Sequence, residues 1–294
     1  MATQQYPTWL SPWYRLGPVL LPAHRILSRL RSRPPSPGFR VLLFHDIPAE
    51  RLTRFERLVL YLRDNHGLLT PDEGRQWLAG EGNRPTAGRE PCLLTFDDGF
   101  GSQARAAREV LGPLGISAVF FVCPSLMATA PDEQRAAIAE HVFAGAIPAA
   151  RLPADMALMS WDDVKGLAEA GHAVGSHTGS HGRLTALEET ERKREIVDSG
   201  DLLASRLGRP VEWFAYPFGN IASIDAQALA IIRSRYDMCC SGVAGLNTAA
   251  TDPLAVLRQN VDLDLSFAYQ RFVIEGGMDF VYKGAAREYR SMVS

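Results

Sequence analysis

Two adjacent carboxylates form the first pattern in this sequence whose residue types and spacing could support catalysis. Asp97 and Asp98 lie in segment 95–99 (TFDDG), directly after the apolar run 92–94. Like charges this close repel each other, and a bound cation or a split of their pKa values commonly offsets the cost. The same residues are also typical of a turn followed by a helix N-cap. Taken alone, the segment leaves a cation site and a structural turn as alternatives.

Two histidines four residues apart form the second chemical pattern. His177 and His181 lie in segment 175–181 (GSHTGSH). They share one face if the segment is helical, and an irregular turn can also bring them to one ion. Together with a carboxylate from the Asp97-Asp98 pair, two imidazoles leave open positions on a metal for water and substrate. The two patterns together therefore predict a catalytic metal site.

Two further features could contribute to catalysis. Segment 214–219 (FAYPFG) suits a tight turn whose backbone N–H groups could face a developing oxyanion, although by itself it is only a turn. His45 ends the apolar run 41–45. It is interpreted either as a core histidine that supports other site residues or as a catalytic acid.

The elements that must position these residues follow a repeating pattern. From residue 39 onward, short apolar runs alternate with helical patterns, which is typical of βαβ units and a parallel sheet. The expected strands lie near 40–45, 92–96, 117–123, 172–176, 212–215, 237–241 and 255–259. The expected helices lie near 53–66, 102–112, 132–144, 161–170, 187–207, 222–234 and 266–275.

Such a chain forms a closed barrel or a doubly wound sheet, and both place their chemistry at the carboxyl ends of the strands. The residues that leave the expected strands there are ionisable or can bind metals: His45, Asp97, Asp98, His177, His181 and Arg258. Their shared position predicts one functional rim.

Composition excludes several classes of protein. The chain has 294 residues, a length that suits two domains or one α/β barrel. Its 31 basic and 33 acidic residues give a net charge of −2, which offers no broad basic surface for nucleic acid. The four cysteines show no CxxC spacing and are expected to be buried and free.

The first 37 residues are unusual. Apolar residues there alternate with arginines, and a Pro-rich stretch, 34–38, follows. A secretory signal has a different order of charge and apolar core, and no apolar run reaches the ~18 residues of a spanning helix. Two interpretations remain: a helix packed on the domain, or a basic interfacial segment that contacts a membrane or a partner. We accordingly expect a cytoplasmic protein or one peripheral to a membrane.

The three motifs, TFDDG, SHTGSH and FAYPFG, occur in an order that resembles the polysaccharide deacetylase family. This family has the NodB homology domain and forms carbohydrate esterase family 4. The resemblance implies a distorted (β/α)7 barrel, with a single catalytic domain over 39–294 after an N-terminal extension over 1–38. It also implies a divalent metal, usually zinc.

The implied activity is that of a hydrolase acting on carbon–nitrogen bonds other than peptide bonds. A metal-activated water would remove an acetyl group from a sugar or polysaccharide, and an N-acetyl group is the expected substrate. The early strand ends in a Phe-His pair. In this feature the sequence resembles the exopolysaccharide poly-N-acetylglucosamine deacetylases.

Site residues follow from the resemblance position by position. The metal ligands of the family match Asp98, His177 and His181. Asp97 matches the catalytic base, and the amide of Phe218 matches an oxyanion donor. His45 matches the general acid.

The sequence departs from the family pattern in two places. Ala215 stands where many members carry the arginine that steers the catalytic aspartate, and we hypothesise that Arg258 replaces it. The usual late Leu-His pair is missing, which leaves His45 as the candidate acid.

Three other functions are considered. Two histidines and one carboxylate also bind iron in non-haem oxygenases, but the β/α pattern and the second aspartate argue against that class. A sugar-binding barrel without turnover is suggested by Ala215. A deacylase of a small acylated metabolite is the third.

Overall fold

Eight strands form the central sheet of the computed structural model, which describes residues 13–30, 37–81 and 89–293. The strands are β1 (Gly38–Phe44), β2 (Cys92–Phe96), β3 (Val119–Val122), β4 (Ala173–Ser176), β5 (Trp213–Ala215), β6 (Met238–Cys240), β7 (Asn247–Thr248) and β8 (Arg258–Asn260). Each expected strand is present, although the one expected near 255–259 begins only at Arg258, after a 3-10 turn over Pro253–Ala255, and β7 is an additional short strand.

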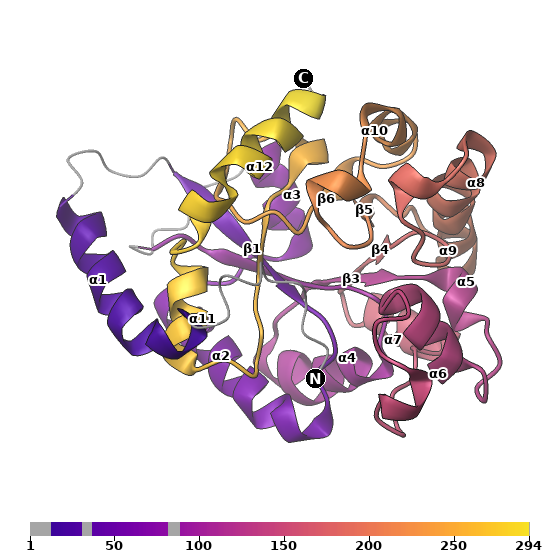
Figure 1. Ribbon diagram of the computed structural model, residues 1–294, viewed down its shortest axis with the longest axis horizontal. Helices are drawn as coiled ribbons and strands as arrows, with labels where there is room; N and C mark the ends of the chain where they lie inside the picture. The colour runs from indigo at the N-terminus through magenta and orange to yellow at the C-terminus, as the bar shows by residue number, and fades with distance from the viewer. Residues whose placement is uncertain (1–12, 31–36, 82–88, 294) are drawn as a thin grey trace.

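The strands curl into a ring. Strands β1 to β6 pair in parallel and in sequence order, and β8 pairs in parallel with the other side of β1. A single parallel bridge, between Cys240 and Val256, connects β6 to the segment that enters β8. β7 adds to β1 in the antiparallel direction. The seven parallel strands confirm the expected distorted (β/α)7 barrel (Figure 1).

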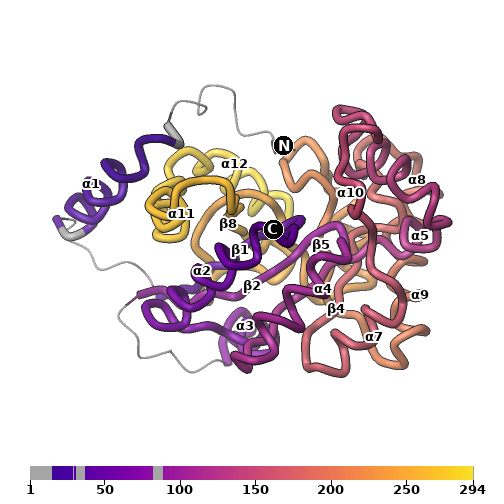
Figure 2. The backbone as a smooth tube through the Cα atoms, turned by 90° about the horizontal axis from the view of Figure 1, so that it is seen from below, coloured from indigo at the N-terminus to yellow at the C-terminus, as the bar shows by residue number. Residues whose placement is uncertain are grey.

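Helices surround the ring (Figure 2). They are α1 (Gly17–Leu30), α2 (Leu52–Asn65), α3 (Pro71–Leu78), α4 (Gly101–Ala106), α5 (Pro124–Met127), α6 (Gln134–Ala137), α7 (Trp161–Glu169), α8 (Glu189–Lys193), α9 (Ser199–Leu207), α10 (Ala226–Arg233), α11 (Phe267–Ile274) and α12 (Asp279–Val293). Capping boxes begin α3 at Thr70 and α7 at Ser160, where each hydroxyl accepts from an N–H in the first turn. Helices α3, α5 and α12 were not expected from the sequence.

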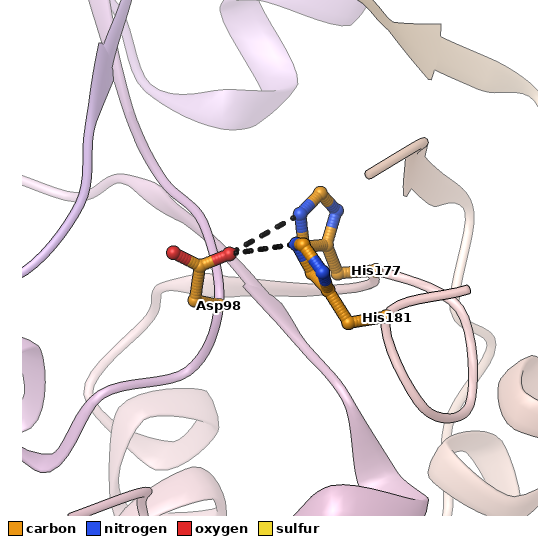
Figure 3. Close-up of side chains that lie close together, drawn as sticks. All are labelled: Asp98, His177 and His181. Atoms are coloured by element: carbon orange, nitrogen blue, oxygen red, sulfur yellow. Dashed lines mark ion pairs between the residues drawn. The ribbon is translucent and has the colours of Figure 1, made fainter. Parts of the chain in front are cut away.

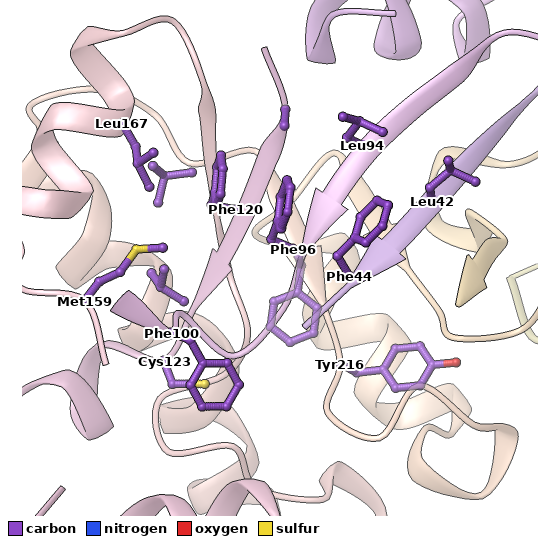
Figure 4. Close-up of a cluster of buried hydrophobic side chains, with 14 of the residues drawn as sticks. Leu42, Phe44, Leu94, Phe96, Phe100, Phe120, Cys123, Met159, Leu167 and Tyr216 are labelled. Carbon is purple, nitrogen blue, oxygen red and sulfur yellow. The ribbon is translucent and has the colours of Figure 1, made fainter. Parts of the chain in front are cut away.

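Side chains alternate between two cores because successive strand residues point to opposite faces. One core fills the barrel and joins residues from five strands and the bridge segment, among them Val41, Leu93 and Phe121. The other lies between the strands and the helices (Figure 4). There Phe96 stacks on Phe120 at 4.6 Å and on Phe44 at 5.4 Å, which ties β1, β2 and β3 together.

The four cysteines are buried and free, as expected. They lie in apolar surroundings, and burial raises the pKa of Cys92 and Cys239 to about 12. These thiols therefore behave as small apolar side chains rather than as redox or metal groups.

The N-terminal extension is partly described. Residues 31–36, which include most of the Pro-rich stretch, lie outside the described residues. Helix α1 packs against α11 at one edge of the molecule, where Leu21 meets Tyr269 and Phe272 (Figures 1 and 2). Among the described helices, none combines the length and apolar character that crossing a bilayer requires.

Candidate active site

The two aspartates stand where β2 ends. Phe96 is the last residue of the strand, and Asp97 and Asp98 follow it with side chains that are almost fully buried. Asp98 has a φ of 76° and Gly99 a φ of 72°, so the chain leaves the strand through a left-handed turn. This turn is sharp, and it leaves both carboxylates at the carboxyl end of the barrel.

The two histidines occupy an irregular turn after β4, and not a helix. β4 ends at Ser176, and Thr178 and His181 have φ values of 66° and 64°. Neither residue type favours the left-handed region, so the surrounding contacts must hold them there. The turn brings both imidazoles to the same place as Asp98 (Figure 3).

The three side chains are arranged as a metal site would need. Nε2 of His177 lies 3.4 Å and Nε2 of His181 3.2 Å from Oδ1 of Asp98. The three potential ligand atoms lie within 4.8 Å of one another, and all three residues are buried.

The other nitrogen of each ring is occupied. Nδ1 of His177 donates to the carbonyl of Ala215 at 2.7 Å, and Nδ1 of His181 donates to the carbonyl of His141 at 2.9 Å. A carbonyl can only accept, so each bond leaves the lone pair on Nε2. Such partners fix ring orientation in metal-binding histidines. The residues present therefore fit a divalent cation.

Asp97 is held by a buried arginine. Nη1 and Nη2 of Arg258 each donate to one carboxylate oxygen of Asp97 at 2.7 Å. Arg258 is fully buried, and its Nε donates to the carbonyl of Ser241 at 2.6 Å. Burial alone would raise the pKa of Asp97, but the positive charge of Arg258 and its hydrogen bonds hold that pKa below its ordinary value. Asp97 is thus ionised.

The FAYPFG segment reaches the histidines from β5. Phe218 has a φ of 64°, and its ring lies edge-on to that of His181 with centroids 5.0 Å apart. The guanidinium of Arg183 covers the same ring at 4.2 Å. Gly219 also has a positive φ, and a Cβ there would come within 2.6 Å of the backbone nitrogen of Gly242. This close approach requires glycine.

His45 follows β1 at the same rim. Burial lowers the pKa of His45 below its ordinary value, while the charges of Asp98 and Asp97 oppose that decrease. The imidazole is therefore neutral at rest at pH 7, and its pKa responds to charge in the site.

Unusual backbone geometry concentrates in this region. Among the described residues, five other than glycine have positive φ, and four of them belong to the site: Asp98, Thr178, His181 and Phe218. Left-handed conformations cost free energy and often accompany functional sites.

One residue that holds the site together was missed from the sequence. The carboxylate of Glu195 accepts from the backbone N–H of Ser180 at 2.8 Å and from its hydroxyl at 2.7 Å. The carbonyl of Glu195 also accepts from the N–H of Gly179 at 3.0 Å. Glu195 thus fixes the turn between the two histidines. Because it lies in an ordinary helical pattern, nothing in the sequence distinguished it from a solvent-facing charge.

A family model for polysaccharide deacetylases matches residues 84–234, which is just over half of the chain. The chain belongs to the polysaccharide deacetylase family. This family is one of carbohydrate deacetylases, so the chain is classed with the hydrolases. The matched region contains the segments TFDDG, SHTGSH and FAYPFG, whereas β1 and β8 lie outside it.

Relatives with known structure share the family fold. IcaB from Ammonifex degensii is 23% identical, with a TM-score of 0.62 over 81% of this chain and 98% of IcaB. The deacetylase PplD from Streptococcus pyogenes, solved with acetate, is 19% identical with the same TM-score, over 82% of this chain and 99% of PplD.

A curated relative covers less of the chain. YxkH from Bacillus subtilis (strain 168), which carries the name of a polysaccharide deacetylase, is 25% identical over 187 residues. The match covers 61% of this chain and 56% of YxkH, so it spans little more than half of that relative.

Proposed function

We propose that this chain hydrolyses the acetyl group of an acetylated sugar or polysaccharide, with an N-acetyl group as the preferred substrate. The observation that carries the proposal is the ionised, arginine-bound carboxylate of Asp97 beside the Asp98, His177 and His181 cluster. A base next to a metal site is what hydrolysis by an activated water requires.

A divalent cation would be held by Asp98, His177 and His181, and two imidazoles with one carboxylate favour zinc. When bound, the cation supplies Lewis-acid polarisation of the acetyl carbonyl and lowers the pKa of water. The binding residues are buried and held in place by the carbonyls of Ala215 and His141, so little reorganisation is needed.

The residues of the chain supply the proton transfers. Asp97 accepts a proton from the attacking water, and the Arg258 guanidinium keeps the carboxylate ionised and oriented. We assign the backbone N–H of Phe218 to the developing oxyanion.

His45 delivers a proton to the sugar nitrogen as the carbon–nitrogen bond breaks, so acetate and a free amine leave. Asp97 then releases to solvent the proton that it took from water, which restores the ionised base. It is neutral at rest, and negative charge that builds up beside it raises its pKa so that it takes up a proton from solvent.

Arg258 bears on the alternative of a sugar-binding barrel without turnover. That alternative was suggested by Ala215, which lacks the guanidinium of many family members. Arg258 reaches Asp97 from β8 and provides a guanidinium at the carboxylate in spite of Ala215. This contact favours an enzyme over a binding protein.

The proposal is tested by acetate release from a panel of N-acetyl and O-acetyl sugars and small acylated metabolites, with and without a chelator. We expect release from N-acetyl sugars that the chelator abolishes. Asp97→Asn is expected to lower turnover by at least ~10²-fold while the protein still binds one metal. Asp64→Asn, an exposed carboxylate, is the control.

Comparable turnover in Asp97→Asn would refute the assignment of the base. Binding of acetylated oligosaccharide without acetate release by the metal-loaded protein would favour the binding barrel instead. Release from small acylated metabolites alone would favour the metabolite deacylase.

A further inference from the structure

Helix α1 exposes a set of large apolar side chains. The five on α1 and the residue before it are Leu16 (41% exposed), Val19 (64%), Ile26 (57%), Leu27 (62%) and Leu30 (73%). In the rest of the described chain, only Leu202 and Phe280 are comparably exposed. Single exposed apolar residues are ordinary, whereas a contiguous set marks an interaction surface.

These side chains form one stripe. At 100° per residue, positions 16, 19, 26, 27 and 30 fall within about 100° of the helix circumference. We call this set the α1 stripe. It lies opposite Leu21, which is buried against α11. Both views place α1 at the outer edge of the molecule (Figures 1 and 2), so the stripe faces away from the barrel.

The opposite side of α1 is fastened to the domain. A Cβ on Gly17 would come within 2.6 Å of the backbone nitrogen of Tyr269, so the two helices touch closely at their first turns. Further along, the imidazole of His24 bonds to the carbonyl of Glu275 at 2.9 Å, and Arg25 pairs with the Glu275 carboxylate. The helix cannot rotate to bury its stripe without breaking these contacts.

The charge of the N-terminal extension indicates what binds the α1 stripe. The extension over 1–38 contains five arginines and no aspartate or glutamate, whereas the rest of the chain has 26 basic and 33 acidic residues. The apolar stripe therefore belongs to the one strongly basic segment of an otherwise acidic protein. A second copy of α1 would bring an equally basic segment against it, which is unfavourable. An anionic lipid surface offers both an apolar layer and the opposite charge.

We propose that the α1 stripe docks onto an anionic membrane surface, with α1 lying in the plane of the interface. The helix does not span the bilayer, since it has only 14 residues. The barrel would be carried on the α11 side of α1. This surface is separate from the site residues, so the proposal stands or falls independently of the deacetylase activity.

The test uses the full chain and vesicles of phosphatidylcholine alone or mixed with phosphatidylglycerol. We expect co-sedimentation with the anionic vesicles, weakened by salt because screening acts within about 10 Å at 0.1 M. The variant Val19→Ser/Ile26→Ser/Leu27→Ser should lower the partition coefficient at least tenfold. Leu202→Ser, an exposed leucine on α9, is the matched control and should bind as the unchanged protein does.

Three results would overturn the proposal. The first is no binding of the unchanged protein to anionic vesicles, and the second is equal binding by the triple variant. The third is self-association in sedimentation velocity that the triple variant abolishes, which would assign the stripe to a second copy. The far-ultraviolet circular dichroism and thermal midpoint of the variant establish that it folds, since only exposed side chains change.

Discussion

Asp97 and Arg258 lie 161 residues apart in the chain and form the tightest charged contact of the site. Removing two charges from water costs several kcal/mol for each, and bidentate geometry with further hydrogen bonds must offset that cost. Here the carbonyl of Ser241 and the hydroxyl of Thr95 also accept from the guanidinium. The buried charges of Asp97 and Arg258 are therefore compensated only when both residues and their hydrogen-bond partners are present.

Replacement of the arginine should affect both stability and catalysis. We expect Arg258→Ala to lower the free energy of unfolding by about 3–5 kcal/mol, because a buried charge loses its partner. Turnover should fall by at least ~10²-fold, since the base loses its orientation. Urea unfolding and acetate release measure the two effects.

A double variant separates these effects. Asp97→Asn/Arg258→Gln removes both charges, so it should recover stability but not turnover. Undiminished turnover in a folded Arg258→Ala protein would show that Arg258 does not position the base.

Glu195 provides a second prediction at the level of single residues. Glu195→Ala removes both bonds to Ser180 and should weaken zinc affinity by about 10–100-fold, the usual effect of losing a residue that supports a ligand. Glu195→Gln keeps an acceptor and should have a smaller effect. Competition with a fluorescent chelator measures affinity without relying on activity. Glu191→Ala, exposed on the same helical stretch, is the control, and equal affinity in all three variants would contradict the prediction.

At the scale of elements, His172 links the amino ends of two neighbouring strands. Its Nδ1 accepts from the backbone N–H of Ala118 at 3.1 Å, just before β3, and the residue itself precedes β4. Burial lowers the pKa of His172 to about 4. Between pH 6.5 and about 4 the unfolded chain therefore binds a proton that the folded chain does not, so stability falls as pH falls.

His172→Asn should remove this pH dependence, since the Asn oxygen can accept the same bond without titrating. We expect the slope of unfolding free energy against pH to differ between the two proteins by up to about 1.4 kcal/mol per pH unit in that window. Unfolding by urea at a series of pH values measures it. Equal slopes of unfolding free energy against pH in the two proteins would mean that a group other than His172 causes the pH dependence.

The parallel strands and most of the helices between them could be predicted because short apolar runs and helical periodicity alternate regularly. Helix α12 was missed although its buried residues Ala286, Tyr289 and Val293 recur at helical spacing, a pattern that could have predicted it. Strand β7 has two residues and is defined by its backbone pairing with β1. A strand as short as β7 is fixed by tertiary contacts and leaves almost no pattern in the sequence.

At the scale of the whole molecule, the barrel rule placed the site at the carboxyl ends of the strands, and the aspartates and histidines expected there do follow their strands. Arg258 differs from this prediction, because it is the first residue of β8, pairs with Val41 inside β1, and reaches Asp97 only through its long side chain. What the sequence could not reveal were the groups that orient the histidines. The carbonyls of His141 and Ala215 belong to the backbone, so residue type does not identify them. The bond from His181 to the carbonyl of His141 also shows that the segment between β3 and β4 reaches the rim.

The N-terminal extension and the barrel contribute unequally to activity and to stability. We propose that residues 39–294 form the catalytic domain and that the extension stabilises it. Deleting residues 1–36 should lower the thermal midpoint by several degrees, because Tyr269, Phe272 and Met278 lose the cover of Leu21. Metal content and acetate release per folded molecule should persist, and their loss would place α1 within the active unit.

The single bridge between Cys240 and Val256 closes the ring just ahead of the strand that carries Arg258. During synthesis on the ribosome, Asp97 emerges 161 residues before this partner. Until β8 is inserted, the barrel has an open seam and its base has no counter-charge. A chain that ends before β8 therefore lacks the counter-charge of its base, and we expect such an incomplete translation product to have no partial activity.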